Sequence, residues 1–153
     1  MKHVKKSVLL GFSAPQMYRL VTDIEDYPHF LPWCEKAEVV SQNDGGVTAR
    51  LHLSYAGVRH AFTTRNIHDP DRSVRIELVD GPFSQLDGHW QFMPLAKPGA
   101  DETEGSQACK IEFEMRYDFS NFALEALVGP VFDRIANTFV DSFVKRAEQV
   151  YGS

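Results

Sequence analysis

The residue types that most often carry enzyme or metal chemistry are present in this sequence, but their spacing fits none of the usual centres. The chain has two cysteines and six histidines, and the histidines stand at positions 3, 29, 52, 60, 68 and 89. No two of them are three or four residues apart, so no helix can present a histidine pair to a metal ion. The sequence also contains no nucleophile elbow, no glycine-rich phosphate loop and no Cys-x-x-Cys pair. We therefore predict a protein without a metal site and without a catalytic residue set.

Two further arrangements could support acid–base chemistry or metal binding, and the strand pattern argues against both. Glu112 and Glu114 alternate with apolar residues, which places both on the solvent face of a strand. His52 and His60 lie on opposite parities of a predicted hairpin, so their side chains point to opposite faces of the sheet. His60 is expected to face the core or a cavity.

Arginines are unevenly distributed over the predicted strands. Four of them occupy outward positions on neighbouring strands: Arg50, Arg59, Arg65 and Arg75. Glu77 is the one acidic residue expected among them. Such a face is either ordinary solvated surface or a docking face for an anionic partner, such as ribosomal RNA or lipid head groups. The formal net charge of −5 argues against attraction of nucleic acid by the whole surface, so we predict no DNA binding.

Apolar residues follow strand spacing through most of the chain. We expect an opening strand over 4–12, a helix capped by Ser13, and a short helix or turn at 26–30. Period-two alternation predicts further strands at 47–55, 58–67, 74–78, 86–92 and 109–119. The final stretch, 121–151, changes to helical spacing with a phenylalanine-rich stripe. Pro130 predicts a break or kink near the start of that helix.

Turn signals separate the predicted strands. Ala56-Gly57 predicts a two-residue hairpin turn that places Leu51 opposite Phe62. Two Asp-Gly pairs, at 80–81 and 87–88, predict turns on either side of a short aromatic segment. We expect these turns to fix the shape of a pocket.

These elements predict an α+β fold in a single domain over residues 1–153. A curved antiparallel sheet of about six or seven strands is expected to wrap around the C-terminal helix, with two short helices after the first strand. A bent sheet meets such a helix closely at its ends and poorly in the middle, which leaves an apolar space. Because an empty void of roughly 300 Å³ would cost ~7 kcal/mol, we expect this space to be collapsed, wet or filled by a ligand. Four aromatic residues are expected near its mouth: Phe30, Trp33, Phe83 and Trp90.

Composition and the N-terminal residues suggest where the protein works. With 43% hydrophobic and 24% charged residues, the chain can build a core and remain in solution. The N-terminal lysines precede only a short apolar patch, and no segment approaches the ~20 apolar residues of a membrane span. Cys34 and Cys109 are expected to stay reduced, and residues 97–106 to form a solvated loop. We predict a cytoplasmic protein, with transient peripheral contact at the inner membrane as the alternative.

Five motifs resemble one known family. They are YPHFLPWC at 27–34, FTTRN at 62–66, LVDGPF at 78–83, WQFMPL at 90–95 and FVKRAEQVY at 143–151. Together they resemble the coenzyme-Q-binding START-like family, which includes the bacterial ribosome-association toxin. The resemblance implies a helix-grip fold, as in START lipid-transfer and polyketide-cyclase-like proteins. It also implies two alternative functions: binding of ubiquinone or a related polyisoprenoid in support of respiration, or inhibition of ribosomal subunit association.

Three hypotheses follow. The first is a non-enzymatic carrier, needing no other cofactor, that encloses an isoprenoid tail between the sheet and the terminal helix, where each buried methylene contributes ~0.8 kcal/mol. Its predicted tail contacts are Phe30, Trp33, Phe62, Leu78, Phe83, Trp90, Phe113, Phe132 and Phe139, with His60 or Tyr55 at the head group. The second is a translation inhibitor that binds the large ribosomal subunit through the four arginines named above. The third, a polyketide-cyclase-like enzyme, depends on fold analogy alone.

Overall fold

The computed structural model describes residues 1–95 and 107–152, which form seven strands, two α-helices and one 3-10 helix. In chain order these are β1 (Lys2–Leu10), α1 (Ala14–Thr22), the 3-10 helix η1 (Ile24–His29), β2 (Cys34–Asn43), β3 (Gly46–Tyr55), β4 (Val58–Asp69), β5 (Ser73–Asp80), β6 (Phe83–Leu95), β7 (Ala108–Phe119) and α2 (Phe122–Tyr151). The expected loop at 97–106 lies outside the described residues. None of the described helices is long and apolar enough to cross a membrane.

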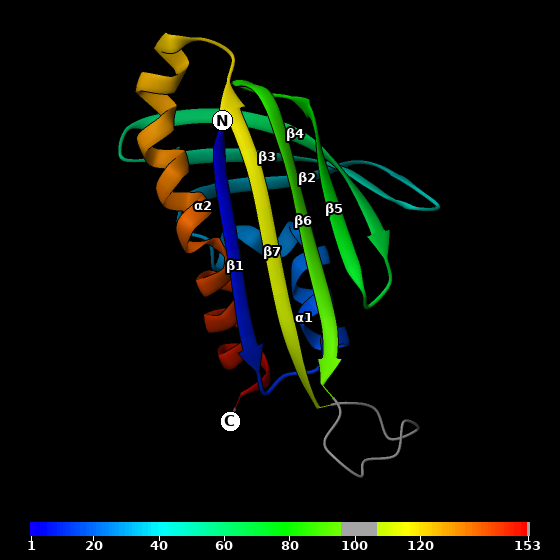
Figure 1. Ribbon diagram of the computed structural model, residues 1–153. Helices are drawn as coiled ribbons and strands as arrows, with labels where there is room; N and C mark the ends of the chain where they lie inside the picture. The colour runs from blue at the N-terminus through cyan, green and yellow to red at the C-terminus, as the bar shows by residue number, and fades with distance from the viewer. Residues whose placement is uncertain (96–106, 153) are drawn as a thin grey trace.

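The seven strands form one antiparallel sheet in the order β1-β7-β6-β5-β4-β3-β2. The first two strands are therefore its edges, and α1 with η1 carries the chain from one edge to the other. Figure 1 shows β2, β3 and β4 running at a steep angle to β1, β7 and β6, so that the sheet curls around α2. The predicted α+β fold, a curved sheet around a long terminal helix, is confirmed.

The β3–β4 hairpin has the predicted turn and register. Ala56 and Gly57 take positive φ angles of 50° and 81°. A two-residue turn of this kind matches the right-handed twist of the flanking strands. Leu51 lies opposite Phe62, as predicted, and both are buried. Residues of the other parity, including the arginines of these strands, therefore face away from α2.

Side-chain caps fix the starts of both α-helices. Ser13 is the N-cap of α1, as predicted: its Oγ accepts from the Gln16 backbone N–H at 3.2 Å, and the Gln16 Oε1 accepts from the Ser13 N–H at 2.9 Å. This reciprocal pair satisfies two backbone donors that the first turn leaves free. Asn121 caps α2, because its Oδ1 accepts from the Leu124 N–H at 2.9 Å.

The predicted break near Pro130 does not occur, and α2 is a single helix from Phe122 to Tyr151. Pro130 cannot donate a hydrogen bond to the carbonyl of Ala126 in the preceding turn. Both residues are exposed, so water can solvate that carbonyl. Packing of the following turns against the sheet then holds the helix together.

Two predictions about the sheet need correction. The sequence pattern predicts no strand over β2. The register shifts between Cys34 and Lys36 and between Val39 and Ser41 explain the omission, because each shift interrupts the alternation that marks a strand.

The Asp-Gly pair at 87–88 is not a turn. Gly88 lies within β6, where it is opposite Ile76 on β5 and Met115 on β7.

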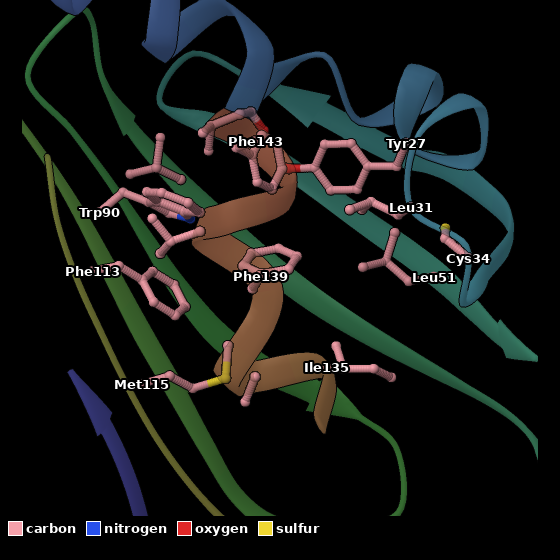
Figure 2. Close-up of a cluster of buried hydrophobic side chains, with 14 of the residues drawn as sticks. Tyr27, Leu31, Cys34, Leu51, Trp90, Phe113, Met115, Ile135, Phe139 and Phe143 are labelled. Atoms are coloured by element: carbon pink, nitrogen blue, oxygen red, sulfur yellow. The ribbon is translucent and has the colours of Figure 1, made fainter. Parts of the chain in front are cut away.

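Aromatic rings fill the core between α2 and the sheet. Trp90, Phe113 and Phe143 are fully buried, and the Trp90 ring lies 4.6 Å from Phe113 and 5.3 Å from Phe143, centroid to centroid. Figure 2 shows Phe139 and Phe143 of α2 directed toward Trp90 and Phe113 of the sheet and toward Tyr27 of η1. Rings in such tilted and edge-to-face contact gain stability beyond the area they bury. This end of the interior is packed solid.

Candidate functional site

A small internal cavity lies beside this packed region, between α2 and the middle of the sheet. The volume of this cavity is about 50 Å³. At ~10–15 Å³ per water, that is room for only a few molecules. Its walls are formed by Tyr27, Trp33, Leu51, Phe62, Thr64, Asn66, Ile76, Leu86, Met115, Phe132, Ile135, Ala136 and Phe139. Of the three states expected for this space, the structure is closest to the collapsed one.

The structure brings four of the predicted tail contacts to this cavity: Trp33, Phe62, Phe132 and Phe139. The other predicted contacts do not line it. Trp90 and Phe113 belong to the packed region, whereas Phe83 stacks on Phe119 at 5.2 Å and meets Phe132 edge-on at 4.8 Å. Phe30 lies under the Arg146 guanidinium at 5.3 Å, and Leu78 is half-buried.

The two predicted head-group contacts also lie away from the cavity. Tyr55 lines an outer groove, and His60 is half-buried near the same end of the β3–β4 hairpin. Two polar side chains that do line the cavity are on β4. Thr64 and Asn66 are 5% and 7% exposed, and the Thr64 hydroxyl donates to the Asn66 Oδ1 at 2.9 Å. Their signal was in the sequence, because both share the inward parity of Phe62.

A thin wall separates the cavity from the outer groove. The groove runs along α2 from Val131 to Lys145 and faces Pro32 and Tyr55. Its volume is about 310 Å³. Trp33 and Ile135 line both spaces. Displacing these two side chains would therefore join the cavity to solvent.

Burial keeps the two thiols and the Tyr27 phenol protonated at neutral pH. Cys34 and Cys109 are free, as predicted, and burial raises the pKa of each thiol to about 11. A protonated thiol is a weak nucleophile. Burial also raises the pKa of Tyr27, whose hydroxyl donates to the carbonyl of Val21. Within residues 1–95 and 107–152 no group of three His, Cys, Asp or Glu side chains is placed to hold a metal ion.

The outer face of the sheet carries three of the predicted arginines in a row. Arg65 on β4 lies opposite Thr48 on β3 and Glu77 on β5. Arg50 follows Thr48 by two residues and Arg75 precedes Glu77 by two. The arginines thus form a diagonal across β3, β4 and β5, hereafter the arginine row, with neighbours ~7–8 Å apart. All three are exposed, and none forms an ion pair with another described residue.

Arg59, the fourth predicted arginine, is not part of this row. Its Nη2 lies 3.6 Å from the Glu35 Oε1 on β2, and both side chains are largely exposed. An exposed pair of this kind contributes little to stability. It does reduce the charge that Arg59 can offer to a partner.

The expectation that Glu77 is the one acidic residue on this face is wrong. Glu38 lies opposite Arg50 on β2, and Asp87 lies opposite Glu77 on β6. The sequence pattern misses Glu38 because it does not predict β2 as a strand. Glu38 is held by Lys36 at 2.7 Å and His52 at 3.4 Å, and the Lys36 hydrogen bond lowers its pKa. The charge of Glu38 is therefore directed toward Lys36 and His52.

The fold and the small apolar cavity define a helix-grip protein of the START/cyclase type. The solved structure of the Zhui aromatase/cyclase from Streptomyces sp. R1128 superposes with a TM-score of 0.79 at 18% identity, covering 97% of this chain and 94% of that one. At this identity the likeness shows the fold alone. Residues 10–144 match the family model described as polyketide cyclase / dehydrase and lipid transport, and the chain belongs to this family.

Curated relatives extend over the whole chain. The ribosome association toxin RatA of Vibrio cholerae is 41% identical over 152 residues, covering 99% of both chains. The mitochondrial coenzyme Q-binding protein COQ10 homolog B of Xenopus laevis is 30% identical over 148 residues, covering 96% of this chain and 58% of that protein. The resemblance to a family with these two branches is confirmed.

Proposed function

We propose that this protein associates with the large ribosomal subunit and inhibits subunit joining. The observation that carries the proposal is the arginine row, three exposed cations on neighbouring strands without ion-pair partners among the described residues. Guanidinium groups bind phosphate oxygens in a bidentate manner, and each contact releases counterions from RNA. The name of the Vibrio cholerae relative, at 41% identity, supports the same assignment.

The overall charge of −5 is compatible with this proposal. A negative protein is repelled by RNA at most orientations, so the face with the arginine row can approach more closely than the acidic faces. The antiparallel sheet is a rigid support, which keeps the three guanidinium groups at fixed spacing. Glu77 and Asp87 flank the row and would disfavour contact beyond its edge.

Sedimentation of purified ribosomal subunits with added protein tests this function. The wild-type protein should shift the equilibrium from joined ribosomes to free subunits. The triple variant Arg50→Glu, Arg65→Glu, Arg75→Glu should leave subunit joining unchanged. A matched control carries the same charge reversal at three cations elsewhere, Arg19, Arg134 and Lys145, and should act like wild type. Loss of the effect in the control, with retention in the row variant, would overturn the proposed face.

A second candidate function is non-catalytic binding of an apolar ligand, with ubiquinone or a related polyisoprenoid as the proposed ligand. The apolar cavity supports it, as do the lipid-transport description of the family and the name of the Xenopus relative. At about 50 Å³ the cavity must expand to admit a tail, and displacement of Trp33 and Ile135 would join it to the groove. Lipid extraction and mass spectrometry of gently purified protein should recover an isoprenoid; protein free of lipid and without saturable quinone binding would exclude this function.

A further inference from the structure

We infer that Asn66 is the polar anchor of the cavity, and that it selects neutral apolar ligands that carry a carbonyl oxygen. This inference rests on the second candidate function, binding of an apolar ligand. It concerns a residue that none of the sequence patterns for ligand contact included. Three observations lead to it: the burial of Asn66, the orientation of its amide, and the absence of charge on the cavity walls.

Asn66 is buried where a polar side chain needs a partner. It lies on the inward parity of β4, lines the cavity and is only 7% exposed. Its Oδ1 accepts from the Thr64 hydroxyl at 2.9 Å. Its Nδ2 has no hydrogen-bond partner in the part of the chain that the structure describes. The Nδ2 is not among the described side-chain atoms that are both fully buried and unpaired, so it keeps some accessible surface. A ligand in the cavity that accepts its hydrogen would gain binding energy.

The hydrogen bond from Thr64 occupies one atom of the Asn66 amide. A hydroxyl that donates to the Oδ1 keeps the amide oxygen toward Thr64, which leaves the Nδ2 as the free group. Of the other polar wall groups, the Tyr27 hydroxyl is already engaged, because it donates to the Val21 carbonyl. The cavity therefore offers an N–H donor in otherwise apolar surroundings. A carbonyl oxygen is the complementary group.

The remaining walls exclude charged ligands. No Lys, Arg, His, Asp or Glu is among the described residues that line the cavity. A carboxylate or ammonium group transferred there would lose its hydration without gaining a counter-charge. A pure hydrocarbon would fit the apolar walls but leave the Asn66 amide unpaired. The preferred ligand is thus uncharged, mostly apolar and carries a hydrogen-bond-accepting oxygen.

Two probes that differ only in the carbonyl group test this inference. Undecyl methyl ketone and tridecane are both volatile, so headspace gas chromatography can measure the free concentration of each above a protein solution. Asn66→Leu keeps a similar side-chain shape and removes the donors. It should weaken ketone binding about tenfold, the loss of roughly one buried hydrogen bond. Tridecane binding should be unchanged or tighter.

A second pair of variants guards against a general structural effect. Thr64→Val removes the hydroxyl that orients the amide and should also weaken ketone binding, by about threefold. Thr63→Val makes the same chemical change at the next residue, on the opposite parity of β4, and should leave both probes unaffected. Far-ultraviolet circular dichroism and thermal unfolding confirm that each variant is folded. Asn66→Leu also removes the acceptor of the buried Thr64 hydroxyl, so it should unfold at a somewhat lower temperature than wild type while remaining folded.

The possible failures are distinguishable. If Asn66→Leu binds the ketone as tightly as wild type, or loses both probes equally, Asn66 is not a carbonyl anchor, although ligand binding by the cavity stands. If wild type binds neither probe, the cavity does not bind apolar ligands, and the inference falls with the function on which it rests.

Discussion

Gly81, in the turn between β5 and β6, is a position where one added methyl group should disturb the cavity. Its φ of 154° is a backbone conformation that residues with a Cβ rarely adopt. A Cβ at this position would lie 2.7 Å from the Phe62 Cβ and 3.3 Å from its Cα. Phe62 lines the cavity and meets the Phe132 ring edge-on at 6.1 Å. In Gly81→Ala, the turn or strand β4 must therefore shift.

The cost can be estimated from these two effects. A non-glycine residue in an unfavourable backbone conformation costs ~1–2 kcal/mol. An overpacked contact in a core adds ~1–3 kcal/mol. Gly81→Ala should thus lower the free energy of unfolding by about 2–5 kcal/mol, a large part of the ~5–15 kcal/mol of a typical domain. Displacement of Phe62 should also weaken ligand binding in the cavity.

Two other glycines serve as matched controls in urea denaturation. Gly57 has a φ of 81° but nothing within 4 Å of the place that a Cβ would take, so Gly57→Ala should cost only the backbone part, about 1 kcal/mol. A Cβ at Gly88 would make an ordinary contact with Ile76 at 3.4 Å, and Gly88→Ala should be nearly neutral. If Gly81→Ala costs no more than Gly57→Ala, the close approach to Phe62 does not require a glycine at position 81, and the reasoning is refuted.

Three further predictions concern the packed region, the cavity and pH. Phe143→Ala should lower the free energy of unfolding by ~3–5 kcal/mol, whereas Phe122→Ala, at an 84% exposed position, should change it by less than ~0.5 kcal/mol; similar values for both in urea denaturation would contradict the packing described. Ala136→Leu should fill the cavity and abolish lipid recovery by mass spectrometry while the protein stays folded, and full lipid recovery would place the ligand elsewhere. Burial lowers the pKa of His68 below its ordinary 6.5, so the unfolded state binds protons more readily and stability should fall as the pH drops through 6.5. His68→Asn should show a smaller fall in urea titrations from pH 7 to pH 5, and an identical pH dependence would exclude this contribution.

The strands and helices that could be predicted are those whose local signals agree with their packing. The Ala56-Gly57 turn sets the register of β3 and β4, and this register decides which residues face α2. Ser13 with Gln16 marks the start of α1 by chemistry that needs no distant contact. These features depend on residues that are close together in the chain, so the sequence alone was sufficient to predict them.

The remaining features depend on contacts between distant segments. The two register shifts of β2 break its alternation, so the acidic neighbour that β2 brings to the arginine row could not be predicted. Gly88 carries a turn signal but is held in β6 by pairing on both sides. The size of the cavity depends on how side chains such as Trp33 and Phe139 pack, with ring centroids 6.2 Å apart, and no periodicity encodes that distance.

The inward position of Asn66 shows that the polar part of the cavity could have been predicted from the alternation of β4. Asn66 and Thr64 share the parity of Phe62 on β4, so the alternation of this strand places two polar side chains in the core. A buried polar pair among apolar neighbours needs hydrogen-bond partners. The tail contacts predicted from the sequence were all apolar, and they omitted both residues. Polar residues on a core-facing parity are a readable signal for a polar anchor.

The salt dependence of affinity for purified large ribosomal subunits tests the central claim most directly. If the arginine row contacts RNA phosphates, the logarithm of the affinity should fall linearly with the logarithm of the salt concentration, and replacing Arg50, Arg65 or Arg75 singly with Gln should reduce the slope by ~1 each. Arg134→Gln, on α2, should leave the slope unchanged. Equal slopes for wild type and all three row variants would contradict the account, because they would show that none of these guanidinium groups meets a phosphate.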